Sequence, residues 1–313
     1  MMVILVFSNE FDAKKRFVTI LKNWKSSSII ASIALVAVCA VWGSTFLIVQ
    51  NAVSRMPVMD FLAVRFTVAT LVMFALRPAC LRGMTLQGLR RGAGLGVVLG
   101  AGYITQTYGL RFASATVSGF ITGMFVVLTP VISWLILGKK VNRNTILAVV
   151  LATVGLALLS LHGWSVGTGE LLTLACAVFF AVHIVGLGEW SAKYDPYGFA
   201  LLQIATVAVI ALLAASPGGI KLPPDGSTWG TVGITAVFAT AAAFLVQTWT
   251  QSLVPAVTAA IIMTMEPVFA GIFGVFFGKN QLTVQIIFGA VCVLTAMLIV
   301  ALKSSPKTAQ PGN

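Results

Sequence analysis

Ten stretches of predominantly apolar residues, each long enough to cross a lipid bilayer, follow one another along this chain of 313 residues. A helix crosses the hydrocarbon with about 20 residues, because each residue advances it by about 1.5 Å. We therefore expect an all-α, polytopic membrane protein with ten transmembrane helices. The expected spans are residues 29–50, 58–76, 92–110, 113–137, 144–161, 168–188, 196–215, 228–250, 256–277 and 283–302.

The charge composition supports a lipid environment. Charged residues make up 9% of the chain and hydrophobic residues 58%, whereas soluble domains carry about 25% charged residues. A soluble protein of this size could not cover its surface with so few ions. The net charge is +12, but the basic residues lie between apolar stretches rather than on one face, which argues against nucleic acid as a partner.

The distribution of lysine and arginine predicts the orientation in the membrane. If the N-terminus is cytoplasmic, the inner segments carry 15 of the 20 basic residues and the outer loops carry 4, with Arg65 left inside a span. Cytoplasmic loops are enriched in lysine and arginine. We therefore expect a multi-pass protein of the cell (inner) membrane with both termini in the cytoplasm.

The two halves of the chain resemble each other at a spacing of about 140 residues. Gln106-Thr107-Tyr108 corresponds to Gln247-Thr248-Trp249, and Gly138-Lys139 corresponds to Gly278-Lys279. Each half holds five spans, an odd number, so the second half must enter the membrane from the opposite side. The expected architecture is two inverted five-helix repeats, which suits alternating access around a cavity at the midplane.

Short motifs recur at defined places in the spans: Trp42-Gly43-Ser44, Arg65-Phe66, Ser114-Ala115-Thr116 leading into Pro130, and Met265-Glu266-Pro267-Val268-Phe269-Ala270. Together they resemble the drug/metabolite transporter superfamily, in its ten-helix EamA-type branch. The resemblance implies a carrier of small solutes such as amino acids and other metabolites. It divides the chain into a cytoplasmic N-terminal segment (1–28), a first EamA-type repeat (29–161), a second, inverted repeat (168–302) and a cytoplasmic tail (303–313).

Ionisable groups inside the spans are rare, and each costs at least about 2.5–3.5 kcal/mol to insert. Arg65 lies about seven residues into the second span, and Glu266 lies in the middle of the ninth. Both are expected to face the bundle interior, where they either form a buried pair that fixes helix packing or bind solute. In the second case Arg65 binds an anionic group and Glu266 binds an amine or a proton.

Other polar and aromatic side chains in the spans suit a solute of mixed polarity. His183 is either a ligand for solute or protons or a neutral, packed histidine. Tyrosine and tryptophan near span ends are alternatively anchors at the membrane interface. The predicted substrate-binding set is Trp42, Arg65, Gln106, Tyr108, His183, Gln203, Gln247, Trp249 and Glu266.

Pro130 and Pro267 fall in the fourth and ninth spans, which correspond between the repeats. A proline inside a helix removes one backbone hydrogen bond and leaves the carbonyl four residues earlier without its donor, here that of Val126 or Met263. Lipid tolerates such a defect only beside protein or a water-filled cavity. We therefore expect a helix break or gating element at each proline, next to the central cavity; the alternative is a simple packing kink.

The sequence predicts a secondary transporter of a small solute, with export of an amino acid or related metabolite as the first choice. Alternatives are efflux of a drug or sugar derivative, a channel, and a non-transporting scaffold. No H-E-x-x-H, G-x-S-x-G or P-loop motif occurs, so we expect no enzyme, no metal and no cofactor. The expected partners are the solute, the bilayer and, if Glu266 couples transport, protons; monomer and homodimer are both compatible with the pattern.

Overall fold

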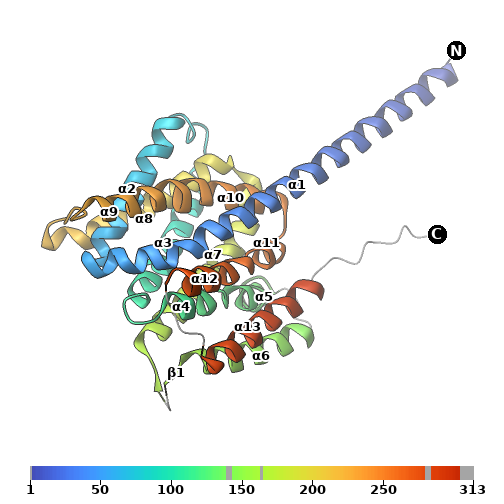
Figure 1. Cartoon of the computed structure of the whole chain (residues 1–313). Coiled ribbons are helices and arrows are strands. Elements are labelled where there is room, and N and C mark those ends of the chain that lie inside the picture. Colours follow the sequence, from blue (N-terminus) through green and yellow to red (C-terminus); the bar gives the residue numbers. More distant parts are fainter. Residues whose placement is uncertain (1, 139–142, 163–164, 279–282, 304–313) are drawn as a thin grey trace.

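The computed structural model describes residues 2–138, 143–162, 165–278 and 283–303, and nearly all of them are helical (Figure 1). The helices of the first half are α1 (Met2–Arg55), α2 (Val58–Leu76), α3 (Leu86–Gly109), α4 (Ala115–Thr122), α5 (Phe125–Leu137) and α6 (Arg143–Ser160). Those of the second half are α7 (Thr168–Trp190), α8 (Pro196–Ala215), α9 (Gly226–Ala236), α10 (Ala243–Leu253), α11 (Ala256–Ile262), α12 (Met265–Phe276) and α13 (Val284–Lys303).

Short elements connect the long helices. A two-stranded antiparallel hairpin, β1 (Leu161–His162) with β2 (Ser165–Val166), lies between the halves. The 3-10 turns η1 (Ser191–Lys193) and η2 (Ser216–Gly218) follow α7 and α8, and a π-helical segment, η3 (Val237–Ala242), joins α9 to α10. The expected turns at Lys139 and Lys279 lie outside the described residues, as does the expected tail beyond Lys303.

Seven helical segments among the described residues are long and apolar enough to cross a membrane. Helices α3, α6 and α13, with 24, 18 and 20 residues, complete the ten predicted spans. Helix α3 is the least apolar of the three, and it packs on both α7 and α8. The prediction of an all-α, ten-helix membrane protein is confirmed. Helix α3 begins at Leu86 rather than at residue 92, since the Thr85 side chain caps it by accepting the Gly88 N–H.

The helix contacts have the pattern of two repeats related by a two-fold axis. Helix α6 packs on α13 and α2 on α8, so each of these pairs joins corresponding helices. Other contacts occur twice, once for each repeat. Helix α3 packs on α7, and their counterparts in the other repeat, α10 and α1, also pack on each other. Likewise α1 packs on α12, and their counterparts α7 and α5 pack on each other. The spans α4–α5 and α11–α12 are both interrupted, at Gly123-Met124 and at Met263-Thr264, which are 263 − 123 = 140 residues apart. The predicted repeat is therefore confirmed.

Helix α1 is much longer than one membrane span. It continues without interruption for 54 residues, and its N-terminal part projects away from the bundle (Figure 1). The apolar part is Ser27–Arg55. The charged N-terminal segment that precedes this apolar part is thus a helical extension of the first span.

Glycine allows α3 to approach α8 closely. A Cβ atom at Gly96 would lie 2.5 Å from the Cβ of Thr206 and 2.8 Å from the carbonyl oxygen of Gln203. Both separations are well below van der Waals contact, so a larger residue would push the two helices apart. This contact fixes the position of Gln203, which lies directly behind the central cavity described below.

We expect Gly96→Ala to destabilise the protein by about 1–3 kcal/mol, the usual cost of overpacking a tight contact. The matched control is Gly94→Ala on the same helix, because a Cβ at Gly94 meets no atom within 4 Å. That variant should be neutral or more stable by about 0.5–1 kcal/mol, since alanine favours the helix over glycine. Thermal unfolding in detergent compares the two, and equal stability would contradict the close α3–α8 contact.

Candidate functional site

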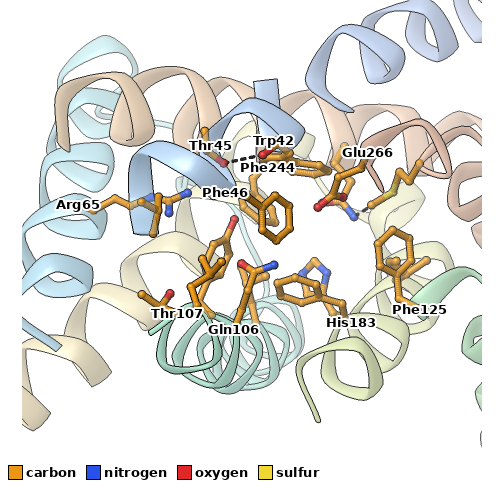
Figure 2. Close-up of a pocket in the computed structure, with 18 residues that line it drawn as sticks. Trp42, Thr45, Phe46, Arg65, Gln106, Thr107, Phe125, His183, Phe244 and Glu266 are labelled. Carbon is orange, nitrogen blue, oxygen red and sulfur yellow. Dashed lines mark hydrogen bonds between the residues drawn. The ribbon is translucent and has the colours of Figure 1, made fainter. Parts of the chain in front are cut away.

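A cavity lies in the centre of the bundle, between helices of both halves (Figure 2). Its volume is about 40 Å³, enough for only a few water molecules. The lining residues are Trp42, Thr45, Phe46, Val49, Arg65, Leu99, Tyr103, Gln106, Thr107, Leu110, Phe125, Phe180, His183, Ile184, Phe244, Gln247, Met263 and Glu266.

The structure brings six of the nine predicted substrate-binding residues together around this cavity: Trp42, Arg65, Gln106, His183, Gln247 and Glu266. The other three are not among the residues that line it. Gln203 is fully buried behind His183, whereas Tyr108 and Trp249 are half-buried on the same helices as Gln106 and Gln247.

Gln203 orients His183. The side-chain Nε2 of Gln203 donates to the carbonyl of Phe199 at 2.8 Å, so its Oε1 is the atom that faces the Nε2 of His183 at 2.7 Å. An amide oxygen can only accept, so this ring nitrogen of His183 carries the hydrogen. Gln203 therefore acts through His183 rather than on the cavity itself.

Arg65 is held by the π-helical segment η3 of the opposite half. Its Nε donates to the hydroxyl of Thr240 at 2.9 Å, and its Nη2 lies 3.5 Å from the carbonyl oxygen of Ala239. The same carbonyl accepts the indole N–H of Trp42 at 2.9 Å. The guanidinium also lies 5.0 Å from the ring centre of Tyr103, within the range of a cation–π contact.

Thr240 and Tyr103 are not among the binding residues predicted from the sequence. A π-helical turn has no sequence signature that would reveal it, although such turns are frequent at functional sites. Tyr103 does carry a signal, since a tyrosine well inside a span needs a partner for its hydroxyl. Its ring also packs at 5.9 Å from Phe244 and 5.5 Å from Phe180.

Glu266 and Gln247 present acceptor atoms without partners to the cavity. Glu266 is 5% exposed, and in the described structure it forms neither an ion pair with Arg65 nor any other side-chain hydrogen bond. Gln247 donates to Gln251 at 3.1 Å, but its own Oε1 is buried without a hydrogen-bond partner among the described residues. In Figure 2, Arg65 and Glu266 point toward the aromatic residues from opposite sides.

The helix breaks precede the prolines rather than follow from them. Gly123-Met124 interrupts the fourth span well before Pro130, which lies inside α5, and Met263-Thr264 interrupts the ninth before Pro267. Pro267 is the third residue of α12, where the backbone N–H has no partner within the helix in any case. The carbonyl of Met263, which the sequence predicts to be free, accepts the N–H of Glu266 at 3.0 Å.

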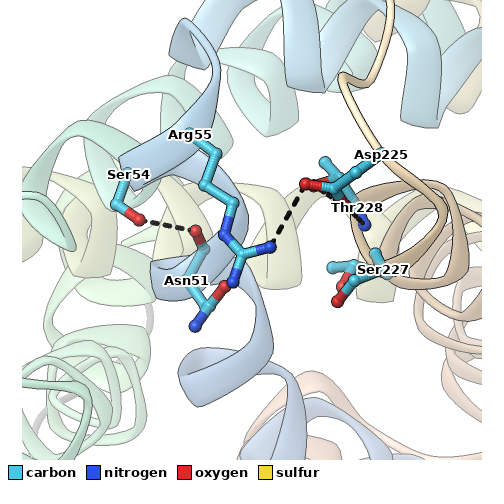
Figure 3. A network of polar contacts seen from close by, with 7 residues as sticks. Asn51, Ser54, Arg55, Asp225, Ser227 and Thr228 are labelled. Atoms are coloured by element: carbon cyan, nitrogen blue, oxygen red, sulfur yellow. Dashed lines mark hydrogen bonds and ion pairs between the residues drawn. The ribbon is translucent and has the colours of Figure 1, made fainter.

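Ion pairs at opposite ends of α2 join the two halves. Where α2 begins, Arg55 pairs with Asp225 at 3.2 Å (Figure 3). Where α2 ends, Arg77 pairs with Asp195 at 3.1 Å. We refer to these two ends of the bundle as the Arg55 end and the Arg77 end.

Both aspartates also cap helices of the second half. Asp225 accepts the N–H of Thr228 at the start of α9, and Asp195 accepts the N–H of Gly198 at the start of α8. The backbone N–H and hydroxyl of Thr228, together with the Arg55 guanidinium, lower the pKa of the Asp225 carboxyl below its usual value. The pair at the Arg55 end therefore keeps its charges into acidic solution.

Side-chain amides tie neighbouring helices together at both ends of the cavity. Toward the Arg55 end, Gln50 donates to the carbonyls of Leu110 at 3.1 Å and Ala113 at 2.8 Å. Toward the Arg77 end, Gln251 donates to the carbonyl of Ile184 at 2.9 Å. Leu110 and Ile184 both line the cavity, so each of these glutamines ties a residue of the cavity wall to a neighbouring helix.

Comparisons with known proteins agree with this architecture. The sequence pattern of the EamA-like transporter family matches residues 29–161 and 167–302. A protein of Archaeoglobus fulgidus named an uncharacterized transporter is 34% identical over 274 residues, 87% of this chain and 86% of the relative. The uncharacterized transporter YetK of Bacillus subtilis is 24% identical over 296 residues, 90% of this chain and 89% of its own. One solved crystal structure, at 18% identity, has the same fold, with a TM-score of 0.65 over 87% of this chain and 97% of its own.

We expect Thr240→Val to destabilise the protein by about 1.5–3 kcal/mol, because the buried guanidinium of Arg65 loses a charged hydrogen bond. Thr240→Ser keeps the hydroxyl and should restore most of the loss. Thr67→Val is the matched control, since the buried hydroxyl of Thr67 has no partner in the described structure. Thermal unfolding in detergent ranks the three variants, and a Thr240→Val protein as stable as Thr67→Val would show that Thr240 does not support Arg65.

Proposed function

This chain belongs to the EamA-like transporter family, and from that premise we propose that it carries a small zwitterionic solute, an amino acid or related metabolite. Membership makes the chain a multi-pass membrane transporter of a small molecule. The solute class, the binding residues, the direction and the alternating-access mechanism are our proposal. Export is the direction that likeness to the family favours.

One observation carries the choice of a zwitterion: a basic and an acidic side chain, Arg65 and Glu266, line the same cavity without pairing to each other. We assign the carboxylate of the solute to Arg65, which Thr240 and Tyr103 already hold in place. We assign the ammonium group to Glu266 and to the free Oε1 of Gln247. A zwitterion of this kind would give each unpaired group a partner, so its binding would offset the cost of burying them.

Support for alternating access comes from the narrow cavity and the repeat architecture. About 40 Å³ is too little for an amino acid, so the helices must move apart before a solute can enter. At each end, a separate side-chain hydrogen bond ties a lining residue to a neighbouring helix: Gln50 holds Leu110 and Gln251 holds Ile184. Inverted repeats can exchange the two arrangements, opening one end while the other stays closed.

The assignment of the solute carboxylate to Arg65 can be tested by substitution. We expect Arg65→Gln to weaken binding of zwitterionic amino acids by about 10- to 150-fold, the loss of one hydrogen bond to a charged group. Arg111→Gln is the control, because Arg111 is exposed and outside the cavity. Equilibrium exchange of radiolabelled amino acids in proteoliposomes measures both. No movement of any zwitterion, with flux of cationic or uncharged solutes instead, would reject the proposed solute class.

Substitution of Glu266 distinguishes two roles for its carboxyl group. If this carboxylate carries protons, Glu266→Gln should abolish flux driven by a pH gradient and spare solute exchange. If it binds only the ammonium group, the same variant should lose exchange as well. Flux that keeps both its pH dependence and its exchange rate would remove Glu266 from the mechanism.

The orientation is tested by labelling single cysteines in a background without Cys39, Cys80, Cys176 and Cys292. Arg82→Cys lies at the Arg77 end and Lys221→Cys lies between α8 and α9, at the Arg55 end, and both positions are exposed. With both termini in the cytoplasm, an impermeant maleimide added outside cells should label Lys221→Cys alone. Labelling of both sites from one side would contradict the inverted arrangement.

A further inference from the structure

A second and larger hollow lies on the outside of the bundle, near the Arg77 end. It is bounded by the first half of α3, the end of α5 and the second half of α7, and we call it the outer groove. Its volume is about 420 Å³, within the range of roughly 300–1,000 Å³ that is typical of ligand pockets. It shares no lining residue with the central cavity, so it is a separate site.

Charged and aromatic side chains surround the mouth of the outer groove. Arg91 is held in place by the hydroxyl of Tyr194 at 3.0 Å and lies 5.3 Å from the ring centre of Trp190. Arg90 stands beside it on α3 and is exposed. The acidic residue among the described lining residues is Glu189, which already interacts within the protein. The mouth therefore carries a net positive charge.

The rest of the outer groove is apolar and follows the helices into the membrane. Leu95 and Val98 of α3 face Val182 and Val185 of α7, and Ile136 at the end of α5 is 58% exposed at the edge. From Arg90 to Val98 is eight residues, about 12 Å along a helix. The hydrocarbon of one leaflet is about 15 Å thick. With Arg90 and Trp190 at the interface, the groove is long enough to extend through most of one leaflet.

We propose that the outer groove binds an anionic phospholipid of the adjoining leaflet. Arg90 and Arg91 bind the phosphate at the interface, and one acyl chain lies along the apolar wall. A soluble anion would leave this wall facing nothing, whereas a phospholipid matches both the charged mouth and the apolar depth. Two arginines against one carboxylate favour an anionic headgroup over a zwitterionic one. Trp190 marks the level of the headgroups, where tryptophan is enriched.

The test uses lipids whose acyl chains carry bromine, which quenches tryptophan fluorescence on contact. The full-length protein in nanodiscs of phosphatidylcholine receives brominated phosphatidylglycerol or brominated phosphatidylcholine with the same chains. The part of the quenching that disappears in Trp190→Phe reports on the outer groove. This part should reach half-saturation at a fraction of brominated phosphatidylglycerol about fivefold lower than the fraction of brominated phosphatidylcholine that is needed. A fivefold difference is the effect of about one interfacial charge.

Variants separate the headgroup from the chain. Arg90→Gln with Arg91→Gln should remove the preference for phosphatidylglycerol, while the control Arg82→Gln, an exposed arginine at the same end, should keep it. Gly94→Leu keeps both arginines and fills the groove, because a Cβ there meets no atom within 4 Å. It should reduce quenching by both lipids, and it decides the matter if the arginine variant fails to fold.

Three results would overturn the proposal. The first is equal quenching by both lipids in the wild type, and the second is an unchanged preference in the arginine variant. The third is displacement of the brominated lipid by millimolar glycerol phosphate, which would identify a site for soluble anions instead.

Discussion

A bilayer interior contains no water to solvate polar groups, so every such group inside the spans must find its partner in protein. Arg65 illustrates the consequence. The residue is 3% exposed, and the groups around its guanidinium are the hydroxyl of Thr240, the carbonyl of Ala239 and the face of Tyr103. Two of these belong to a π-helical turn in the other half of the chain, so burying one charge ties the two repeats together at the centre of the membrane.

Glu266, by contrast, has no side-chain partner within the described part of the protein. Its carboxylate and the Oε1 of Gln247 reach the cavity without partners in the described structure. A buried carboxylate without a partner is costly, and a ligand that supplies the missing contact offsets part of that cost. In our proposal the solute supplies it, which links the cost of the empty site to the specificity of the filled one.

The repeats provide a symmetric frame for chemistry that is not symmetric. At the repeat spacing of 140 residues, Arg65 corresponds to position 205, an alanine, and Glu266 corresponds to position 126, a valine. The helix breaks, by contrast, occur in both copies. Arg65 and Glu266 therefore each occur in one repeat only. The cavity has a basic and an acidic side, although corresponding helices of both repeats line it. The outer groove lies apart from this symmetry and faces lipid rather than solute.

The sequence alone determined the spans, the inverted repeat and the two ionisable residues buried inside the spans. These features depend on local hydropathy and on the odd number of spans in each repeat. It also indicated that Trp42, Gln106, His183 and Gln247 lie near the cavity, since polar groups inside spans are placed toward protein or water rather than toward lipid. Only the tertiary structure decided that Arg65 is bound by Thr240 rather than paired with Glu266, and that the helix breaks precede Pro130 and Pro267. Both outcomes depend on contacts between residues more than 100 positions apart or on backbone turns stabilised by packing. Local sequence patterns do not contain that information.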